Sequence, residues 1–333
     1  MKRISLYSIV AVFALSLCIH TQPLSAAEQV TLRVAHTFAV DHPYSTVCEM
    51  LSKEVAEKTK GQVAIRHYPA GQLGKDNELT DQLIKGTIDL MPAGPTAVGR
   101  YFDPLNCLQV YYLVDSPQQL LKIMRGPIGQ KLYEDLRQKH EVRIMDVMYY
   151  GRRHILTAKK PVNKPQDLKG LKIRSMPTPF LKQSLEAMGP TGVPVDMAEV
   201  YIALQTGVVD GLENTPVSVR LEKYHEVAKF YSLTGHSVHP SLWNMSDKSW
   251  KTKVPEDAKP ILAAAIQRVT EWEIAEMERQ EKEALSFLKS NGVQIIEVDR
   301  ELFRKEVQKV YPEMEKRFGD SFKAIVKAAA ETK

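Results

Sequence analysis

Cysteine is scarce in this sequence. Only Cys18, Cys48 and Cys107 occur among 333 residues, and none of them belongs to a Cys-x-x-Cys pair. A zinc ribbon or a thioredoxin-like redox site is therefore not indicated. Cys48 and Cys107 either pair in an oxidising compartment or are two buried small hydrophobic side chains, and the sequence leaves both interpretations open.

A strong charge of one sign is also missing. The formal net charge is +5, and no run of consecutive lysines and arginines is longer than two residues. Nucleic-acid binders usually carry a clustered basic excess, so we expect no nucleic-acid partner. With 44% hydrophobic and 26% charged residues the chain has a globular composition, and its length suffices for two domains.

Sequence motifs of common enzymes are absent. There is no Gly-x-Ser-x-Gly elbow, no Gly-x-Gly-x-x-Gly turn and no complete phosphate-binding loop. His36, Asp41 and His42 are able to ligate a metal, but polar side chains of a loop after a strand are the better interpretation. We therefore expect no catalytic residue, no cofactor and no metal.

One long hydrophobic run is present, at the N-terminus. It extends from Ile4 to Ile19 after the positively charged Lys2 and Arg3, and Ser25-Ala26-Ala27 follows it. These are the parts of a secretory signal peptide, and the run is shorter than the about 20 residues of a membrane span. We expect residues 1–27 to be cleaved off and the remainder to be exported to the periplasm as a soluble protein.

The remaining chain alternates between strand and helix patterns, which predicts an α/β fold with mostly parallel strands. Strands are expected at 30–35, 63–68, 88–91, 142–150, 154–158, 171–174, 208–209 and 293–298. Helices are expected at 44–59, 76–85, 118–124, 128–139, 180–188, 198–205 and 255–290, with two more after residue 298.

The helix predicted at 255–290 is longer than one small domain requires. An apolar stripe that includes Val269 and Trp272 lies in its first part, 276–283 is almost wholly charged, and 284–288 is apolar again. At 1.5 Å per residue this helix is about 50 Å long. A helix that is apolar at both ends and polar in the middle is expected to lie across two lobes.

Segment 151–214 holds the best candidate for a binding residue. Arg174 ends a strand, and ligands of open α/β sheets bind at the carboxyl ends of strands. Its planar guanidinium can hold a carboxylate through two parallel hydrogen bonds. On the residues alone, however, a solvated or salt-bridged arginine is the more common role.

Several motifs resemble the periplasmic solute-binding proteins of TRAP (tripartite ATP-independent periplasmic) transporters, a family founded on C4-dicarboxylate binders. The resemblance covers essentially the whole exported chain. Its most specific motifs are Asp167-Leu-Lys-Gly-Leu-Lys-Ile-Arg174 and Glu199-Val-Tyr-Ile-Ala-Leu-Gln-Thr-Gly-Val-Val-Asp-Gly-Leu-Glu-Asn214, and Gly71-Gln-Leu-Gly74 and Gly151-Arg-Arg153 support them.

The resemblance implies a two-lobed periplasmic binding protein fold, type II-like, whose lobes are joined by crossover strands and one long helix. Lobe I would consist of residues 28–150 and about 241–280. Lobe II would consist of residues 151–240 and about 281–333.

The resemblance also places the ligand-binding residues. The family's carboxylate-clamping arginine falls on Arg174, its supporting arginine on Arg153, with Arg152 as an alternative, and its ligand-side amide on Asn214.

Four more residues are weaker candidates for the pocket. Glu78 and His36 could accept or donate hydrogen bonds to ligand hydroxyls, and Met197 and Trp243 could form apolar walls. Each also has an ordinary structural role as its alternative, such as a favourable first-turn acid for Glu78 and a core position for Trp243.

The implied function is that of an extracytoplasmic receptor that binds an organic acid between its lobes and delivers it to a TRAP membrane permease, acting as a monomer. The acid would be a sugar acid, a hydroxy acid or a C4-dicarboxylate. Sialic-acid binders of the family carry an acid at Gly94, an aromatic residue at Met197 and an asparagine at Pro177, so these departures argue against sialate. A ligand sensor for a membrane signalling protein and an exported enzyme on the same fold are the alternative functions.

Overall fold

One mixed β-sheet runs through the whole molecule. The computed structural model describes residues 29–332, so the predicted signal peptide, residues 1–27, lies outside the described residues. The strand order is β2-β1-β3-β8-β4-β7-β5-β6, and β9 pairs with β8. The strands are β1 (Val30–Ala35), β2 (Val63–Tyr68), β3 (Leu90–Ala93), β4 (Val142–Thr157), β5 (Lys172–Ser175), β6 (Thr191–Pro194), β7 (Gly211–Asn214), β8 (Phe230–Ser246) and β9 (Gln294–Ile296).

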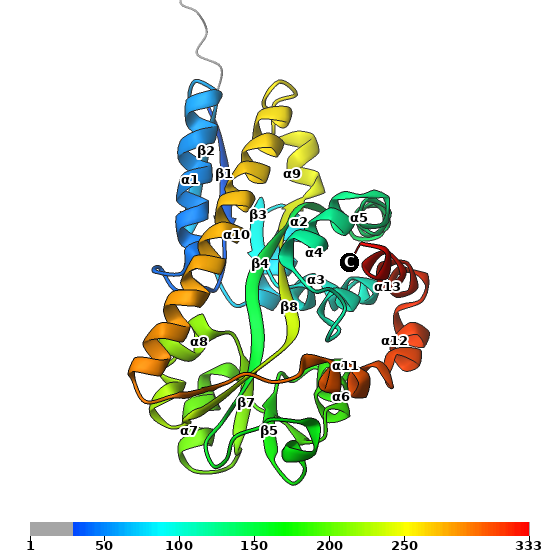
Figure 1. Cartoon of the computed structure of the whole chain (residues 1–333). Coiled ribbons are helices and arrows are strands. Elements are labelled where there is room, and N and C mark those ends of the chain that lie inside the picture. Colours follow the sequence, from blue (N-terminus) through cyan, green and yellow to red (C-terminus); the bar gives the residue numbers. More distant parts are fainter. Residues whose placement is uncertain (1–28, 333) are drawn as a thin grey trace, which may run out of the picture.

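Helices surround this sheet (Figure 1). They are α1 (Pro43–Lys58), α2 (Asp76–Lys85), α3 (Pro95–Gly99), α4 (Pro117–Arg125), α5 (Pro127–His140), α6 (Pro179–Ala187), α7 (Val200–Gln205), α8 (Pro216–Leu221), α9 (Asp247–Thr252), α10 (Ala258–Ser290), α11 (Arg300–Gln308), α12 (Tyr311–Phe318) and α13 (Asp320–Glu331). Four short 3-10 helices are η1 (Asp103–Gln109), η2 (Pro165–Leu168), η3 (Met197–Glu199) and η4 (Tyr224–Glu226).

The first half of the molecule is built on β1, β2 and β3. β1 and β2 are parallel, with Val30 beside Val63, and α1 forms the crossover between them. The expected helix at 76–85 is confirmed as α2, which ends where Gly86 adopts the left-handed conformation. Buried side chains of β1, α1 and α10 form one hydrophobic core here.

The second half is built on β5, β6 and β7. β5 is parallel to both neighbours, with Ile173 beside Gly192 of β6 and Gly211 of β7. The short strand expected to begin at 208–209 is present as β7, but it begins only at Gly211, because 208–209 still lie in the turn after α7.

β4 and β8 cross from one half into the other as a long antiparallel pair (Figure 1). The prediction of two separate strands at 142–150 and 154–158 is wrong, since β4 is continuous over 16 residues. Its register with β8 shifts near Ile144, Tyr149 and Arg153, so bulges bend the pair without ending it. Gly151 has a φ of 130°, which a continuous strand accommodates at such a bulge.

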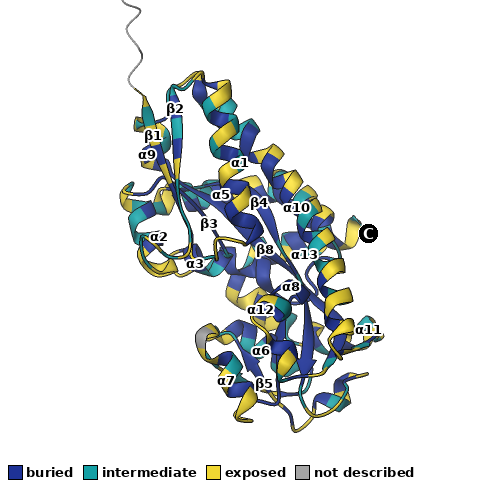
Figure 2. Cartoon of the chain, turned by 90° about the vertical axis from the view of Figure 1, so that its left-hand side faces the viewer, coloured by how far each residue is buried: buried dark blue, intermediate teal, exposed yellow. Residues whose placement is uncertain are grey.

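α10 packs along this crossing, where it contacts α1, β4 and α8. The expected long helix spanning both halves is thus observed, over 33 residues. The expected stripe is correct at Val269 but wrong at Trp272, which is 37% exposed, while the neighbouring Glu273 is fully buried. Figure 2 shows buried segments of α10 on the side that faces β4 and β8.

The chain ends by returning to the first half. α11 contacts β8 and α6, whereas α12 and α13 contact η1, α4 and α5. Three helices therefore follow residue 298, where two were predicted. The expected assignment of 281–333 to lobe II does not agree with the contacts of α12 and α13, and the remaining lobe boundaries stay predictions.

The two cysteines in the described part of the chain do not form a disulfide. Cys48 and Cys107 are both buried and free, which confirms the interpretation as small core side chains. Among residues 29–332, no helix combines the length and the hydrophobicity that a membrane crossing needs.

Candidate functional site

A cleft of about 620 Å³ lies between the two halves. The loops after β1 and β3 line it from the first half, β5, η3 and the β7–α8 region line it from the second, and β4 and β8 form its base. Its lining residues are Thr37, Phe38, Ala39, Asp41, His42, Asp76, Gly94, Thr96, Tyr150, Arg153, Arg174, Met176, Met197, Asn214, Ser218, Leu221, Glu222, His239, Pro240 and Ser241. Four predicted site residues, Arg153, Arg174, Met197 and Asn214, are thus brought together.

Arg174 reaches the cleft from β5 and is 3% exposed. Its Nε donates to the backbone oxygen of Val195 at 2.8 Å, which fixes the plane of the guanidinium. No other residue between 29 and 332 hydrogen bonds to this side chain, and none forms a salt bridge with it. Burial lowers the pKa of Arg174, and the more distant Glu213 charge offsets this in part. Its two terminal nitrogens are therefore available for an anion from the cleft.

Arg153, from β4, is neutralised by a neighbouring carboxylate. Its Nη2 donates to Oε1 of Glu213 at 2.9 Å, and its Nε donates to Oε2 of the same carboxylate. Burial alone would raise the pKa of Glu213, but the Arg153 charge and hydrogen bonds from His236 and Arg153 lower it to about 2. Burial of Arg153 alone would lower the pKa of its guanidinium, but the neighbouring Glu213 raises this pKa above its usual value. Both members of the pair are charged, so together they add no net charge to the cleft.

Asn214 lies at the end of β7, 2% exposed. Its Oδ1 accepts a hydrogen bond from the backbone nitrogen of Thr215 at 2.9 Å, which leaves its amide nitrogen as the group able to donate to a ligand. Ser218 follows on α8, and its hydroxyl contacts the hydroxyl of Tyr150 at 3.1 Å. Asn214, Ser218 and Tyr150 therefore form one polar wall.

Aromatic rings form a second part of the lining, which continues from Tyr150. Phe38 stacks on His42 with ring centroids 4.8 Å apart, and His42 stacks on Tyr150 at 5.9 Å. His239 of β8 meets Tyr150 edge-on at 5.7 Å. Burial lowers the pKa of His42 to about 4 and that of His239 to about 3, so both rings are neutral at physiological pH.

The rim of the cleft is acidic. Asp41, Asp76 and Glu222 line it, and all three side chains are exposed. Oδ1 of Asp76 accepts a hydrogen bond from the Thr37 hydroxyl at 2.8 Å. Met197 is 40% exposed and forms an apolar part of the rim.

Glu78, Trp243 and His36 do not line this cleft. Glu78 is exposed on α2, where its carboxylate accepts from the backbone nitrogen of Lys75 at 2.9 Å, in the helix-start role given as its alternative. Trp243 is fully buried in the core of the first half. His36 is fully buried as well, and its Nε2 lies 2.8 Å from Nε2 of His67.

Arg152 and Arg153, the two alternatives for the supporting arginine, line different cavities. Arg153 lines the cleft, whereas Arg152 points into a separate cavity of about 300 Å³ beside α10. There Nη2 of Arg152 donates to the backbone oxygen of Asp115 at 2.8 Å. The alternation of side chains along a strand, with neighbours on opposite faces, explains the difference.

Sequence reasoning missed the aromatic wall and the acidic rim. These residues come from four separate parts of the chain, and no local motif links them. Phe38 and His42 lie in the loop after β1, Tyr150 lies on β4, His239 on β8, and Glu222 follows α8. The loop after β1 gave one usable signal, since two ring-bearing residues follow a strand end there.

This fold and cleft define a two-lobed receptor for a small anionic solute. Residues 34–317 match the family model of the bacterial extracellular solute-binding proteins, family 7, and the chain belongs to this family. The expected family and the two-lobed fold are thereby confirmed.

Relatives and solved structures agree with this assignment. The sialic acid-binding periplasmic protein SiaP of Vibrio cholerae is 31% identical over 303 residues, which cover 89% of this chain and 93% of SiaP. A TRAP periplasmic solute-binding protein from Ochrobactrum anthropi, with its C-terminus bound in the ligand-binding pocket, has a TM-score of 0.86 at 26% identity and covers 91% of this chain and 95% of its own. A TRAP protein from Chromohalobacter salexigens with bound D-glucuronate has a TM-score of 0.83 at 27% identity, with 91% and 100% coverage. The chain is a solute-binding receptor of the TRAP type.

Proposed function

We propose that this receptor binds a sugar acid with a single carboxylate, which Arg174 clamps through two parallel hydrogen bonds. The observation that carries the proposal is the contrast between the two arginines of the cleft. Arg153 is paired with Glu213, whereas Arg174 forms no salt bridge with any described residue. A buried guanidinium without a counter-ion favours a ligand that brings one.

The remaining lining favours a polyhydroxylated body for this acid. Asn214, Ser218 and Ser241 offer hydrogen-bonding groups inside the cleft, and the rim carboxylates can accept from ligand hydroxyls. A C4-dicarboxylate would bring a second negative charge toward Asp41, Asp76 or Glu222, and no second unpaired cation of the lining would receive it. D-glucuronate, the ligand of the Chromohalobacter relative, has the required single carboxylate.

Sialate fits this lining less well than a hexuronate does, in spite of the similarity to SiaP. Gly94 and Met197, which line the cleft, occupy two of the positions where sialic-acid binders are expected to carry an acid and an aromatic ring. The cleft therefore lacks these groups at both positions.

The clamp is tested by calorimetric titration and thermal shift with D-glucuronate. We expect binding to the parent protein, and a loss of about a hundredfold to a thousandfold in affinity for Arg174→Ala, because truncating one partner of a buried charged pair costs about 3–5 kcal/mol. Arg174→Lys keeps the charge but not the fork, so it should also bind weakly.

Arg66→Ala is the matched control, since Arg66 is exposed on β2 and does not line the cleft. It should bind as the parent does. Full affinity in Arg174→Ala would contradict the clamp, and preferential binding of neutral sugars or of succinate by the parent would contradict the substrate class.

We further propose that the protein works in the periplasm as a monomer and delivers its ligand to a TRAP permease. The family membership supports this role. Deleting the gene should abolish uptake of labelled D-glucuronate by the cells, and the parent gene should restore uptake whereas the Arg174→Ala gene should not. Unchanged uptake would favour the alternative of a ligand sensor.

We propose that binding is not followed by chemistry. The cleft places neutral histidines and a paired carboxylate near Arg174, and family members are receptors. Proton NMR of D-glucuronate incubated with the protein should show the sugar acid unchanged, and new product signals that disappear with Arg174→Ala would overturn this.

A further inference from the structure

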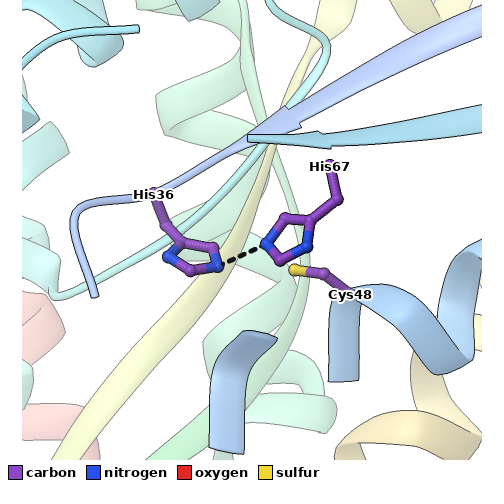
Figure 3. A group of neighbouring side chains, drawn as sticks. All are labelled: His36, Cys48 and His67. Atoms are coloured by element: carbon purple, nitrogen blue, oxygen red, sulfur yellow. Dashed lines mark hydrogen bonds between the residues drawn. The ribbon is translucent and has the colours of Figure 1, made fainter. Parts of the chain in front are cut away.

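Two histidines and a cysteine lie together behind the cleft, where they take no part in lining it. His36 follows β1, His67 lies on the neighbouring strand β2, and Cys48 lies on α1, which covers both strands. Figure 3 shows the two imidazole rings facing each other and the sulfur of Cys48 beside the His67 ring. Their ligand atoms all lie within 4.8 Å of one another. Asp41 and His42, which are also able to ligate a metal and lie close to His36 in the sequence, do not belong to this group.

The two imidazole rings are in direct contact. The Nε2 atoms are 2.8 Å apart, so one ring donates its N–H and the other accepts it. Both nitrogens thus point at the same small volume. His36 is fully buried, and its other nitrogen, Nδ1, has no hydrogen-bond partner in the described chain. The pair therefore satisfies only part of its hydrogen-bonding capacity while two nitrogens converge.

We propose that His36, His67 and Cys48 form a binding site for a soft monovalent metal ion, copper(I). Two imidazole nitrogens and one sulfur are the ligand types that soft first-row ions prefer. Three ligands suffice for copper(I), whereas structural zinc sites take four.

The charge of the site favours the monovalent ion. His36 and Cys48 are fully buried, and the group that the structure brings together contains no carboxylate. Copper(I) with one thiolate and two neutral imidazoles is uncharged, whereas a divalent ion would leave a net positive charge in this buried position, which is costly.

Binding requires only local changes. The Cys48 thiol releases its proton to solvent, and the ring that carries its proton on Nε2 carries it on Nδ1 instead, so one proton leaves for each ion bound. His67 is only partly buried and provides the path of entry. The bound ion would tie β1, β2 and α1 together directly before Thr37 and Phe38, which line the cleft.

The test is an anaerobic titration of the purified, reduced protein with copper(I) against a chromophoric copper(I) chelator. We expect one ion per chain, and X-ray absorption at the copper edge should show one sulfur and two nitrogen neighbours. Cys48→Ala and His67→Gln should each weaken binding at least about a hundredfold, since even the outer partners of metal ligands typically contribute 10–100-fold.

Cys107→Ala is the matched control, because Cys107 is the other buried free cysteine and should bind copper(I) as the parent does. His67→Gln keeps the test valid if Cys48→Ala fails to fold, since the half-exposed His67 tolerates change better. Undiminished binding in His67→Gln, no binding by the parent, or tighter binding of zinc(II) than of copper(I) at these residues would each overturn the proposal.

Discussion

Two arginines of the same cleft have opposite roles because of a single carboxylate. Glu213 lies beside Arg153 and forms two hydrogen bonds with its guanidinium, and Arg174, on the next strand but one, has no such partner among the described residues. In the proposed function, the neutralised Arg153 supports the architecture and the unpaired Arg174 binds the ligand. The difference between the two arginines therefore depends on which residues of neighbouring strands lie side by side, because the residue type is the same.

Glu213→Gln should strongly destabilise the protein. The substitution leaves the Arg153 charge buried and unpaired, which costs about 3–5 kcal/mol of unfolding free energy. Urea unfolding followed by circular dichroism measures this. Glu199→Gln, in the same motif but exposed, should leave stability within about 0.5 kcal/mol of the parent. Equal stability of the two variants would mean that the pair contributes nothing.

The same carboxylate should make the protein acid-sensitive in a narrow window. The pKa of Glu213 is lowered to about 2, so its contribution is complete above the ordinary glutamate pKa near 4.5 and is lost as the pH falls toward 2. The parent should therefore lose more stability than Glu213→Gln between pH 5 and pH 3. Parallel pH curves for the two proteins would contradict this assignment.

The sequence predicted the residues of the motifs but not their neighbours. Arg174 and Asn214 belong to continuous motifs at strand ends, and such positions follow from the alternation of strands and helices. Phe38 and His239 are 201 positions apart and line one cleft because β8 pairs with β3, so their place there depends on tertiary contacts. His36 was expected as a weak candidate for the ligand pocket, but it lies outside the cleft, beside residues of another strand and a helix.

Among the elements, the crossing pair β4 and β8 is where the sequence misled most. Gly151 resembles a strand break, yet a bulge carries the strand through it. β8 lacks a hydrophobic alternation because its buried face includes polar residues, among them Thr234, His236 and Ser241. A strand is recognised in a sequence when apolar and polar residues alternate, because one face of its sheet is buried and the other is solvated. β8 is buried on both faces and borders a polar cleft, so its sequence does not alternate in this way.

Gly151→Ala should cost more stability than Gly207→Ala. Both glycines have a positive φ, of 130° and 74°, and a left-handed conformation costs other residues about 1–2 kcal/mol. A Cβ at Gly151 would also lie 2.8 Å from Cγ2 of Thr215 and 3.0 Å from Oε1 of Glu281, whereas one at Gly207 meets nothing within 4 Å. Overpacking adds about 1–3 kcal/mol at Gly151. The melting temperatures of the two variants are compared. A smaller decrease for Gly151→Ala would show that β4 and its neighbours shift at little cost to accommodate the added Cβ.

α10 introduces a second pH-dependent group. Glu281 accepts from the Tyr149 hydroxyl at 2.9 Å and from the backbone nitrogen of Arg152, with Glu278 nearby. Burial nevertheless raises the pKa of Glu281 to about 7. The folded protein thus holds a proton that the unfolded chain releases near pH 4.5, so this group's contribution is complete below that pH and is lost as the pH rises through 7.

Glu281→Gln should therefore gain stability relative to the parent between pH 5 and pH 8. Buried histidines such as His239 act in the opposite direction, since their lowered pKa removes stability on acidification, but they are common to both proteins. The difference in melting temperature between variant and parent isolates Glu281, and a difference that stays constant with pH would contradict the raised pKa.

At the scale of the whole molecule, the two halves share one sheet. The connections between them at the crossing are regular elements, β4, β8 and α10, and the cleft lies beside them. We therefore expect changes in the angle between the halves to bend the strands at their bulges, near Tyr149 and Arg153, the second of which lines the cleft.

Unfolding of the two halves should form one transition. All three tryptophans, Trp243, Trp250 and Trp272, lie in the first half or on α10, whereas circular dichroism reports on both halves. Fluorescence and circular dichroism should give the same urea midpoint. Two separate midpoints would show that the halves unfold independently despite their common sheet.

The course of the chain also has a consequence for synthesis. The core around β1, α1 and β2 is completed by Trp243 and Met245 of β8 and by 258–269 of α10. When only the first 140 residues have emerged from the ribosome, this core is consequently incomplete and its apolar strands are exposed. The core of the first half is therefore completed only after residue 269 has been synthesised, which leaves a long interval in which chaperones can bind the chain.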